Sequence, residues 1–584
     1  MTSDHYSAFI AEAFVKPIRS VLIVDDDYPT FDEMLDKQIA QGGDGDPPNS
    51  NKKWYDAPAR IKTVIDSFRR PDRPLLVDIH DGTNVDAHGD AKVAAHLHQS
   101  DLLVLDYELD KARPRDGRRA IDILRSLMSN DHFNLVVVHT SDNLDYVHRQ
   151  IVLGLLSPRD EQVDAEMEGA ALELIAVRED ADEDFAEAFA KVIGEEQYLH
   201  ARLHPESYLR TMGRKQQPYS DFASLADAAG WDNDARKLVL LHQLGRVEAS
   251  LRGGMNSEQD TRVQWSGGAI RWIKSESIFV AFSSKDDHDD LLGDLQKALE
   301  AWGPEPSRLF LAKLRAEMDD YGVVAQSEAL ERKHALAHWY GRLLRAGGQE
   351  RRWLIAESVG RHSDQLLHII LPRVEKFATD LVEAETASGS PDDICNTHFG
   401  VDLTKPEPKK KALREHNAFV CSKPPQGWHL TTGHVFEVEG EHWVCLTPAC
   451  DLVPGQGGAK TAIYGDRIPF VAVKLHPVGD GKSPDVNTNL YVFLHLGGTI
   501  RAFGFNEQGK EAAAPIWRTF YAEKKGVFID EFAFRISSTR PGRRRLISVV
   551  QAAHIVAQLR YEYALNLMQK LGISMTRIGL DFAG

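Results

Sequence analysis

The sequence predicts an α/β protein: a doubly wound parallel sheet with helical inserts, then a helical segment and a β-rich C-terminal domain. Three observations support this fold class. Within residues 1–300, short apolar runs end abruptly in polar side chains, and helical patterns separate these runs. Beyond residue 416, the pattern changes to short strands punctuated by Gly and Pro, which is typical of a small barrel or sandwich.

Polar side chains follow three of the apolar runs directly. The run at residues 21–24 ends in Asp25 and Asp26, a second run ends in Asp106, and a third ends in Thr140. Near-continuous apolar runs are typical of strands buried in a parallel sheet, and the carboxyl ends of such strands collect at one edge. We therefore expect oxygen ligands for Mg²⁺, a carboxylate able to attack phosphorus and a hydroxyl to lie together.

This set of residues resembles the receiver domain of bacterial response regulators. The resemblance implies that Asp25, Asp26 and Asp106 bind Mg²⁺. It also implies that Asp106 takes a phosphoryl group from a partner histidine kinase and that Thr140 changes position in response. A receiver has a flavodoxin-like sheet, so the resemblance and the apolar pattern imply the same fold.

The order of elements agrees with that resemblance. Residues 74–79 are suited to the second strand, and residues 91–99 to the helix before the third. Asp116–Gly117 matches the acid-glycine pair in the family's loop after the phosphoacceptor, although it lies about three residues further on than usual.

The family also has a lysine at the end of its fifth strand. We assign this role to Lys285, which ends an apolar run at residues 277–284 and precedes a helical pattern at 289–299. The resemblance implies that Lys285 binds phosphoryl oxygens and that Phe282 is the switch aromatic. Asp286 stands where receivers usually have proline.

The predicted organisation follows from these assignments. The receiver-like domain is discontinuous, and its inserts are a Gly- and Pro-rich loop and a mostly helical region that we interpret as a docking surface. The ranges are 1–300 for the receiver-like domain with inserts at about 28–58 and 157–268, 301–386 for the helical segment, 387–415 for a linker and 416–584 for the C-terminal domain.

A long amphipathic helix is predicted to close the chain at residues 548–571. Apolar and aromatic side chains recur there at every fourth position, which is typical of a core or dimer-forming helix. These residues are Ile555, Leu559, Tyr563, Leu567 and Leu571.

Residues 447–452 form the sharpest local motif of the C-terminal half. Cys450 and Asp451 follow a proline turn, and His434 is a candidate partner. We expect Cys450 to be a buried structural cysteine, with a metal site or a catalytic thiol as the alternatives.

Charge and composition limit the partners. Lys and Arg total 69 against 87 Asp and Glu, and the net charge of −18 argues against unspecific binding to nucleic acid or anionic membranes. For the basic loop at residues 540–545 we expect a solvated loop or an acidic partner, with nucleic-acid phosphates as the alternative. The N-terminal residues lack signal-peptide character, and residues 490–500 are too short to span a bilayer, so we expect a cytoplasmic protein without membrane contact.

The leading functional hypothesis is a signalling protein that is phosphorylated on Asp106 and switches a helical or C-terminal output surface. In layout the chain resembles receiver-like proteins of bacterial conflict or anti-phage operons, which implies a histidine-kinase-like ATPase or another defence protein as partner. The helical segment is also suited to homodimer formation. Two alternatives remain: a degenerate receiver acting as a scaffold or targeting subunit, and an enzyme or metal site built on Cys450.

Overall fold

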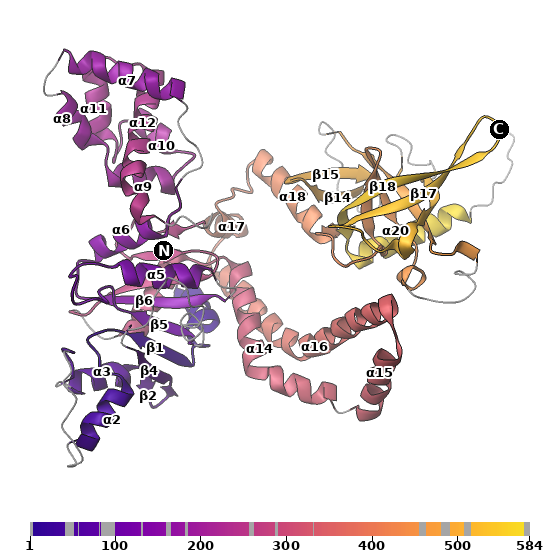
Figure 1. Cartoon of the computed structure of the whole chain (residues 1–584), viewed down its shortest axis with the longest axis horizontal. Helices are drawn as coiled ribbons and strands as arrows, with labels where there is room; N and C mark the ends of the chain where they lie inside the picture. Colours follow the sequence, from indigo (N-terminus) through magenta and orange to yellow (C-terminus); the bar gives the residue numbers. More distant parts are fainter. Residues whose placement is uncertain are drawn as a thin grey trace. The chain divides into compact units, whose positions relative to one another are not determined.

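The computed structural model divides the chain into two compact units, Met1–Ala316 and Glu317–Gly584 (Figure 1). It describes residues 4–40, 52–55, 58–80, 82, 100–129, 132–158, 165–181, 185–255, 262–286, 290–330, 332–454, 463–479, 491–506 and 515–576. The predicted helix at residues 91–99 lies outside these ranges, as do residues 41–51 and 56–57 of the first predicted insert.

The first unit is built on a sheet with the strand order β4-β1-β5-β6-β9-β8-β7. The five strands from β4 to β9 are parallel, which confirms the predicted doubly wound sheet. Two short antiparallel strands, β8 and β7, extend the sheet beyond β9. The bounds are β1 Ser20–Val24, β4 Leu76–His80, β5 Leu102–Leu105, β6 Asn134–Thr140, β7 Gln264–Trp265, β8 Trp272–Lys274 and β9 Ile278–Ser284.

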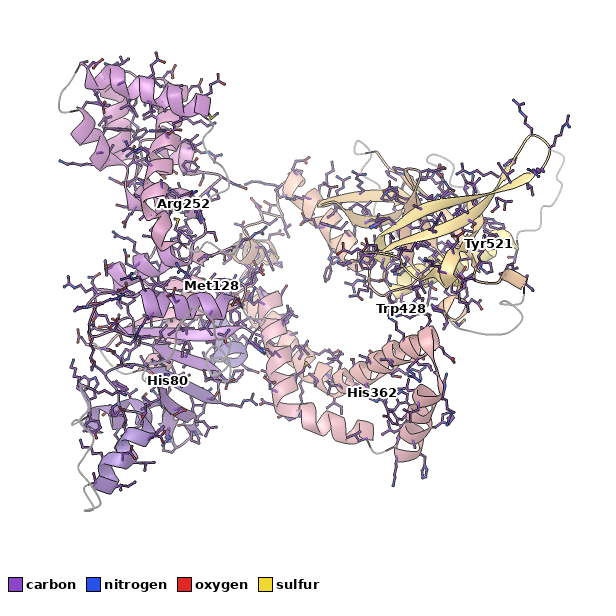
Figure 2. All side chains as sticks on the ribbon, in the orientation of Figure 1. His80, Met128, Arg252, His362, Trp428 and Tyr521 are labelled. Carbon is purple, nitrogen blue, oxygen red and sulfur yellow. The ribbon has the colours of Figure 1, made fainter. Side chains whose placement is uncertain are left out.

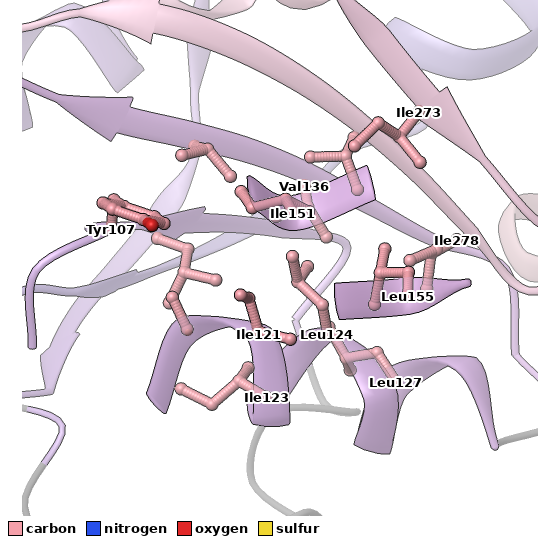
Figure 3. Close-up of a cluster of buried hydrophobic side chains, with 14 of the residues drawn as sticks. Tyr107, Ile121, Ile123, Leu124, Leu127, Val136, Ile151, Leu155, Ile273 and Ile278 are labelled. Atoms are coloured by element: carbon pink, nitrogen blue, oxygen red, sulfur yellow. The ribbon is translucent and has the colours of Figure 1, made fainter. Parts of the chain in front are cut away.

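Helices α5 (Arg118–Met128) and α6 (Leu144–Leu155) pack their apolar sides against the sheet. Figure 3 shows this core, in which aliphatic side chains from both helices meet those of β6 and of the segments around β8 and β9. Its labelled members are Tyr107, Ile121, Ile123, Leu124, Leu127, Val136, Ile151, Leu155, Ile273 and Ile278.

The remaining elements of the sheet domain are mostly helical. The helix α13 contacts β9 and α1, and the Tyr6 hydroxyl donates to the carbonyl of Pro304 at 2.6 Å. The bounds are α1 Asp4–Ile10, the π-helix η1 Ala11–Val15, α2 Phe31–Ile39, α3 Pro58–Phe68, β2 Arg69–Arg70, β3 Arg73–Pro74, α13 Leu291–Trp302 and α14 Pro306–Leu330. Within the first predicted insert, α2 begins with a capping box formed by Thr30 and Glu33.

The second predicted insert folds as a helical subdomain between α6 and β7. It has a hydrophobic core of its own, which includes Phe185, Tyr198, Phe222, Trp231 and Leu240. The bounds are α7 Ala165–Glu179, α8 Phe185–Val192, α9 Glu195–Leu203, α10 Tyr208–Gly213, α11 Ser220–Ala228, α12 Asn233–Leu251 and the 3₁₀ turn η3 Arg252–Gly254. The helical pattern predicted for this region is therefore present.

Helices continue through the segment predicted to be a linker. After α15 (Lys333–Arg345), α16 (Gly348–Ser388) and α17 (Pro391–Phe399), helix α18 spans Pro406–Cys421. Both α17 and α18 begin with proline, which fits the first position of a helix because that residue needs no intrahelical N–H bond. The prolines that we interpreted as opposing compact structure instead start helices.

The C-terminal strands form an antiparallel barrel. Six strands follow the order β12-β11-β18-β17-β16-β13, and β13 pairs back with β12 to close the ring. A hairpin of β14 and β15 continues from β13, and β10 pairs with β18. The bounds are β10 Ser422–Lys423, β11 His434–Val438, β12 Glu441–Cys445, β13 Ile468–Pro477, β14 Tyr491–Leu496, β15 Thr499–Gly504, β16 Trp517–Ala522, β17 Ala533–Pro541 and β18 Leu546–Leu559.

Alternate residues of the barrel strands enter two different cores. Phe436 and Trp443 lie in a core with Phe520, whereas their neighbours Val435 and Val444 pack in a second core with residues of the terminal helix. That helix, α20, spans Tyr561–Met575. A β-rich domain with a terminal helix is thus present, as predicted.

The predicted helix at residues 548–571 is wrong in its first half. Residues up to Leu559 belong to β18, and only the part from Tyr561 is helical. On β18, Ala553, Ile555, Ala557 and Leu559 are buried at every second position. Because four is a multiple of two, a spacing of four fits a strand face as well as a helix face.

Among the described helices, none combines the length and the apolar character needed to cross a membrane.

Candidate functional site

Four strands of the parallel sheet bring the predicted site residues to one edge. Backbone pairing continues past the strands, because the N–H of Asp106 donates to the Val24 carbonyl at 2.9 Å. The N–H of Lys285 likewise donates to the Thr140 carbonyl at 2.9 Å, and that of Asp25 to the carbonyl of His80 at 3.0 Å. The chain therefore places Asp25, Asp106, Thr140 and Lys285 side by side on neighbouring strands.

Three carboxylates converge at this edge. Asp25 and Asp106 are buried, Asp26 is half-buried, and one oxygen from each lies within 4.8 Å of the others. Carboxylate oxygens at this spacing are the ligands that Mg²⁺ prefers, and two of the three are held by the ends of rigid strands. The donor set therefore fits a hard divalent cation.

Lys285 reaches into the same cluster. Its Nζ lies 2.8 Å from Oδ2 of Asp25 and 2.7 Å from Oδ2 of Asp106, and its side chain is 13% exposed. Burial alone would favour the neutral amine, but the two carboxylates outweigh it and raise the pKa of Lys285. The lysine is therefore held as a cation between the two aspartates.

The cluster carries more negative than positive charge. Burial and the neighbouring Asp25 and Asp27 raise the pKa of Asp26 to about 6. Burial, followed by repulsion from Asp25, also raises the pKa of Asp106, while Lys285 acts in the opposite direction. One lysine does not balance the aspartates, so a further cation would lower the free energy of the ionised site.

Thr140 and Phe282 take different positions relative to this cluster. Thr140 is buried at the end of β6, and its Oγ1 accepts the N–H of Asp142 at 3.1 Å. Phe282 points into the core and makes an edge-to-face contact with His148 of α6, with a centroid distance of 5.2 Å. The residue that the resemblance identifies as the switch aromatic is therefore buried in this structure.

The acid-glycine pair has a packing role. A Cβ atom on Gly117 would lie 1.9 Å from Cε2 of Tyr107, the residue after Asp106. Glycine at this position therefore allows the start of α5 to approach the buried Tyr107 ring. The Asp116 carboxylate is engaged by Arg118, whose Nη2 lies 2.6 Å away.

Charged residues that the sequence analysis missed surround the aspartates. Lys111 Nζ lies 2.6 Å from Oδ1 of Asp27. Burial, followed by the neighbouring Asp142 carboxyl, raises the pKa of Glu108. Glu108 and Asp142 each lie two positions beyond a predicted site residue. That spacing was a usable signal, whereas nothing in the sequence indicated the contact of Lys111.

The C-terminal motif does not assemble around Cys450. Cys450 is exposed at the start of the short turn η4 (Ala449–Leu452), so the prediction of a buried cysteine is wrong. His434 is buried in the barrel, where Nδ1 accepts the N–H of Thr431 at 3.1 Å and Nε2 lies 3.2 Å from the Gln426 carbonyl. Among the described residues, the group of potential metal ligands that lie close enough to share one ion is Asp25, Asp26 and Asp106.

A comparison with known families agrees with this geometry. Residues 17–180 match the model of the family described as Response receiver domain. No curated protein and no solved structure matches the chain. The first unit therefore contains a receiver domain, and Lys285 lies beyond the matched residues, so it is the pairing of β9 with β6 that joins it to the site.

Proposed function

We propose that the chain is a signalling or regulatory protein whose receiver domain accepts a phosphoryl group on Asp106. The observation that carries this proposal is the buried cluster in which Lys285 Nζ contacts both Asp25 and Asp106. It joins a nucleophilic carboxylate, a fixed cation and two further acids at the carboxyl edge of a parallel sheet.

In the proposed reaction, a carboxylate oxygen of Asp106 attacks the phosphorus of a phosphohistidine on a partner kinase. The new P–O bond forms as the P–N bond breaks, and the departing imidazole nitrogen keeps the electron pair and takes a proton from water. Lys285 and the hydroxyl of Thr140 bind the phosphoryl oxygens. A Mg²⁺ ion held by Asp25, Asp26 and Asp106 supplies charge neutralisation at the phosphoryl group when it is bound.

Helix α6 is the proposed route from the site to an output surface. It begins four residues after Thr140, and its His148 packs against Phe282. Ile151 and Val152 lie in the core of the sheet domain, whereas Leu153 lies in the core of the helical subdomain. A shift of α6 upon phosphorylation would therefore reach both cores.

Arg125 of α5 links the same parts. Its Nε and Nη2 donate to the Gly154 carbonyl at the end of α6, at 3.0 and 2.7 Å, and Nη2 also donates to the Gly254 carbonyl at 2.7 Å. Gly254 is the last residue of the 3₁₀ turn η3, which follows α12 of the helical subdomain. This tie supports the helical subdomain as the output surface, and a bias of a few kcal/mol is enough to shift such a two-state element.

The partner that fits this chemistry is a histidine-kinase-like ATPase, and a bacterial defence system is the proposed setting. Both come from the sequence resemblance, because the structure contains one chain. If the acidic cluster does not take up a phosphoryl group, the protein is instead a scaffold that has kept the receiver fold.

Titration calorimetry with Mg²⁺ and beryllofluoride, a phosphoryl mimic, tests the proposal. Wild-type protein is expected to bind one equivalent, and Asp106→Asn is expected to lose that binding while remaining folded with a cooperative unfolding transition. Asp145→Asn removes an exposed carboxylate of α6 that pairs with Arg271, and it is the matched control that should bind normally. Absence of binding to the wild type would reject phosphorylation and leave the scaffold.

A further inference from the structure

A two-stranded ribbon projects from the C-terminal barrel. Strands β17 and β18 pair continuously from Ala533 opposite His554 to Pro541 opposite Leu546. The neighbouring strand β16 reaches only to Ser537 on β17, and β11 pairs with β18 only from His554 onward. Figure 1 shows the two strands continuing beyond the barrel, and Figure 2 shows side chains projecting from the tip.

The ribbon is positively charged, whereas the chain as a whole is negatively charged. Residues 533–559 contain no Asp, Glu or Lys, although the whole chain has a net charge of −18. Its five arginines are Arg535, Arg540, Arg543, Arg544 and Arg545.

The inner arginines are neutralised and the tip arginines are not. Arg535 lies near Glu523, and Arg540 pairs with Glu439. Arg543, Arg544 and Arg545 are exposed in the turn and have no carboxylate partner within the described ranges. The tip therefore presents three guanidinium groups without a carboxylate partner at the end of a hydrogen-bonded β-ribbon.

Exposed aliphatic side chains flank the tip on both faces. Leu546 is 71% exposed, Ile547 41% and Val550 42%. Because successive strand residues point to opposite faces, Leu546 and Val550 lie on one face and Ile547 on the other. A ligand that covers both faces of the ribbon would bury these apolar side chains, and that burial would favour binding.

We propose that this ribbon, residues 539–550 (the arginine ribbon), binds double-stranded DNA by entering the major groove. That groove is about 12 Å wide and admits a two-stranded β-ribbon. A ribbon in a groove is flanked by phosphates on both sides, so consecutive arginines in the turn can each find a phosphate partner. An acidic protein surface faces one side only and would leave part of this charge unpaired.

The shape of the arginine ribbon distinguishes DNA from RNA. About four residue pairs beyond the barrel, at roughly 3.4 Å each, give a reach of about 14 Å, which exceeds the depth of a B-form major groove of about 8.5 Å. The major groove of A-form RNA is too narrow for protein side chains to read. The rest of the acidic surface repels both duplexes, so binding should depend on the tip.

Fluorescence anisotropy with the full-length protein and a labelled 30-base-pair DNA duplex tests this proposal. The variant Arg543→Ala/Arg544→Ala/Arg545→Ala should lose most of the affinity. Since each phosphate contact adds about 0.9 to the salt slope, raising salt from 50 to 200 mM should weaken wild-type binding about 40-fold more than that of the variant. Its thermal unfolding should be unchanged, because the three side chains are exposed.

The matched control is Lys409→Ala/Lys410→Ala/Lys411→Ala, which removes the same charge from helix α18 in the same unit. This control should bind DNA like the wild type. Equal losses in both triple variants would overturn the proposal, because binding would then follow total charge. No binding to DNA, or equal binding to a duplex RNA, would overturn it as well and would favour an acidic protein partner.

Discussion

Lys285 and Asp106 are separated by 179 positions in the sequence, yet the lysine Nζ lies 2.7 Å from Oδ2 of the aspartate. Strand β6, helix α6 and the whole helical subdomain lie between them in the chain. Parallel pairing of β5 with β6 and of β6 with β9 places the two residues at the same sheet edge. The site therefore forms only if the chain returns to the sheet after the helical subdomain.

Replacing Lys285 with methionine should separate the structural and functional roles of the lysine. The variant leaves the aspartates without their fixed cation, and a broken buried ion pair typically costs about 3 kcal/mol in the free energy of unfolding. Mg²⁺ should recover part of that loss, and the variant should bind Mg²⁺ more tightly than the wild type. Binding of the phosphoryl mimic should fall, because its oxygens lose a ligand.

Lys297→Met is the matched control for this experiment. Lys297 lies on α13 with an exposed side chain and pairs with Asp294, so its removal should change unfolding by well under 1 kcal/mol. Calorimetry and chemical unfolding, each with and without Mg²⁺, measure these differences. Equal Mg²⁺ affinity in Lys285→Met and wild type would show that the lysine does not share the site with the metal.

His148 should make the stability of the first unit depend on pH. Its pKa is lowered from 6.5 to about 4, chiefly by burial and to a smaller extent by Arg271, although the hydrogen bond to the Trp272 carbonyl and the charge of Asp145 act in the opposite direction. The unfolded chain therefore binds a proton at His148 more readily than the folded chain, and stability is full above pH 6.5 and is lost as the pH falls toward 4.

Between pH 7 and 5, the loss at His148 should be about 2 kcal/mol. His148→Gln keeps a side-chain donor near the Trp272 carbonyl without titrating, so its stability should change less over this range. Buried His429 and His434 in the second unit also have pKa values lowered to about 4. Their contribution to the pH dependence of stability is the same in the wild type and in His148→Gln. Identical pH dependence in the two proteins would contradict the assignment.

Gly117→Ala should disturb the phosphoacceptor through its neighbour. The new methyl group would lie 1.9 Å from the Tyr107 ring, so the ring or the start of α5 must move. We expect a loss of about 1–3 kcal/mol in unfolding free energy and weaker binding of the phosphoryl mimic. Gly169→Ala in α7, where the methyl group meets open space, should instead stabilise by about 0.5–1 kcal/mol. Normal stability of Gly117→Ala would show that the ring is not confined.

The sequence was sufficient to predict the sheet and its polar edge because buried parallel strands leave a strong local signal. An apolar run followed by Asp25 or Asp106 is visible without knowledge of any long-range contact. Even the strand ending at Lys285 could be found, since its apolar run and the following helical pattern survive the long insert. What the pattern could not supply is the distance between Lys285 and Asp106.

Predictions failed where one spacing fits two structures or where a contact depends on another part of the chain. The spacing from Ile555 to Leu559 fits both a strand and a helix, and pairing with β17 and β11 decides for the strand. The exposure of Cys450 likewise depends on a turn whose surroundings no local pattern describes.

Thiol labelling should distinguish the cysteines and test the alternative of a Cys450-based site. Cys450 is exposed and should react quickly with a disulfide reagent in the native protein. Burial raises the pKa of Cys421 to about 11 and that of Cys445 to about 12, so their thiolates are scarce and both should react only on unfolding. Cys450→Ser should remove the fast phase without changing phosphoryl-mimic binding. A fast phase that persists would mean that another thiol is accessible.

Arg125 should couple the sheet domain to the helical subdomain. Arg125→Met keeps the apolar stem but removes the donors to the carbonyls of Gly154 and Gly254, so the ends of α6 and α12 should lose their common anchor. In hydrogen exchange, the phosphoryl mimic should protect or expose amides of α7 to α12 in the wild type but not in this variant. Mimic binding itself should persist, because the hydrogen bonds of Arg125 go to Asp122, Gly154 and Gly254 and not to Asp25, Asp26 or Asp106. Arg118→Met, an exposed arginine on the same helix, is the control and should keep the wild-type response. If the response of the helical subdomain is the same in Arg125→Met and wild type, the signal does not pass through this anchor.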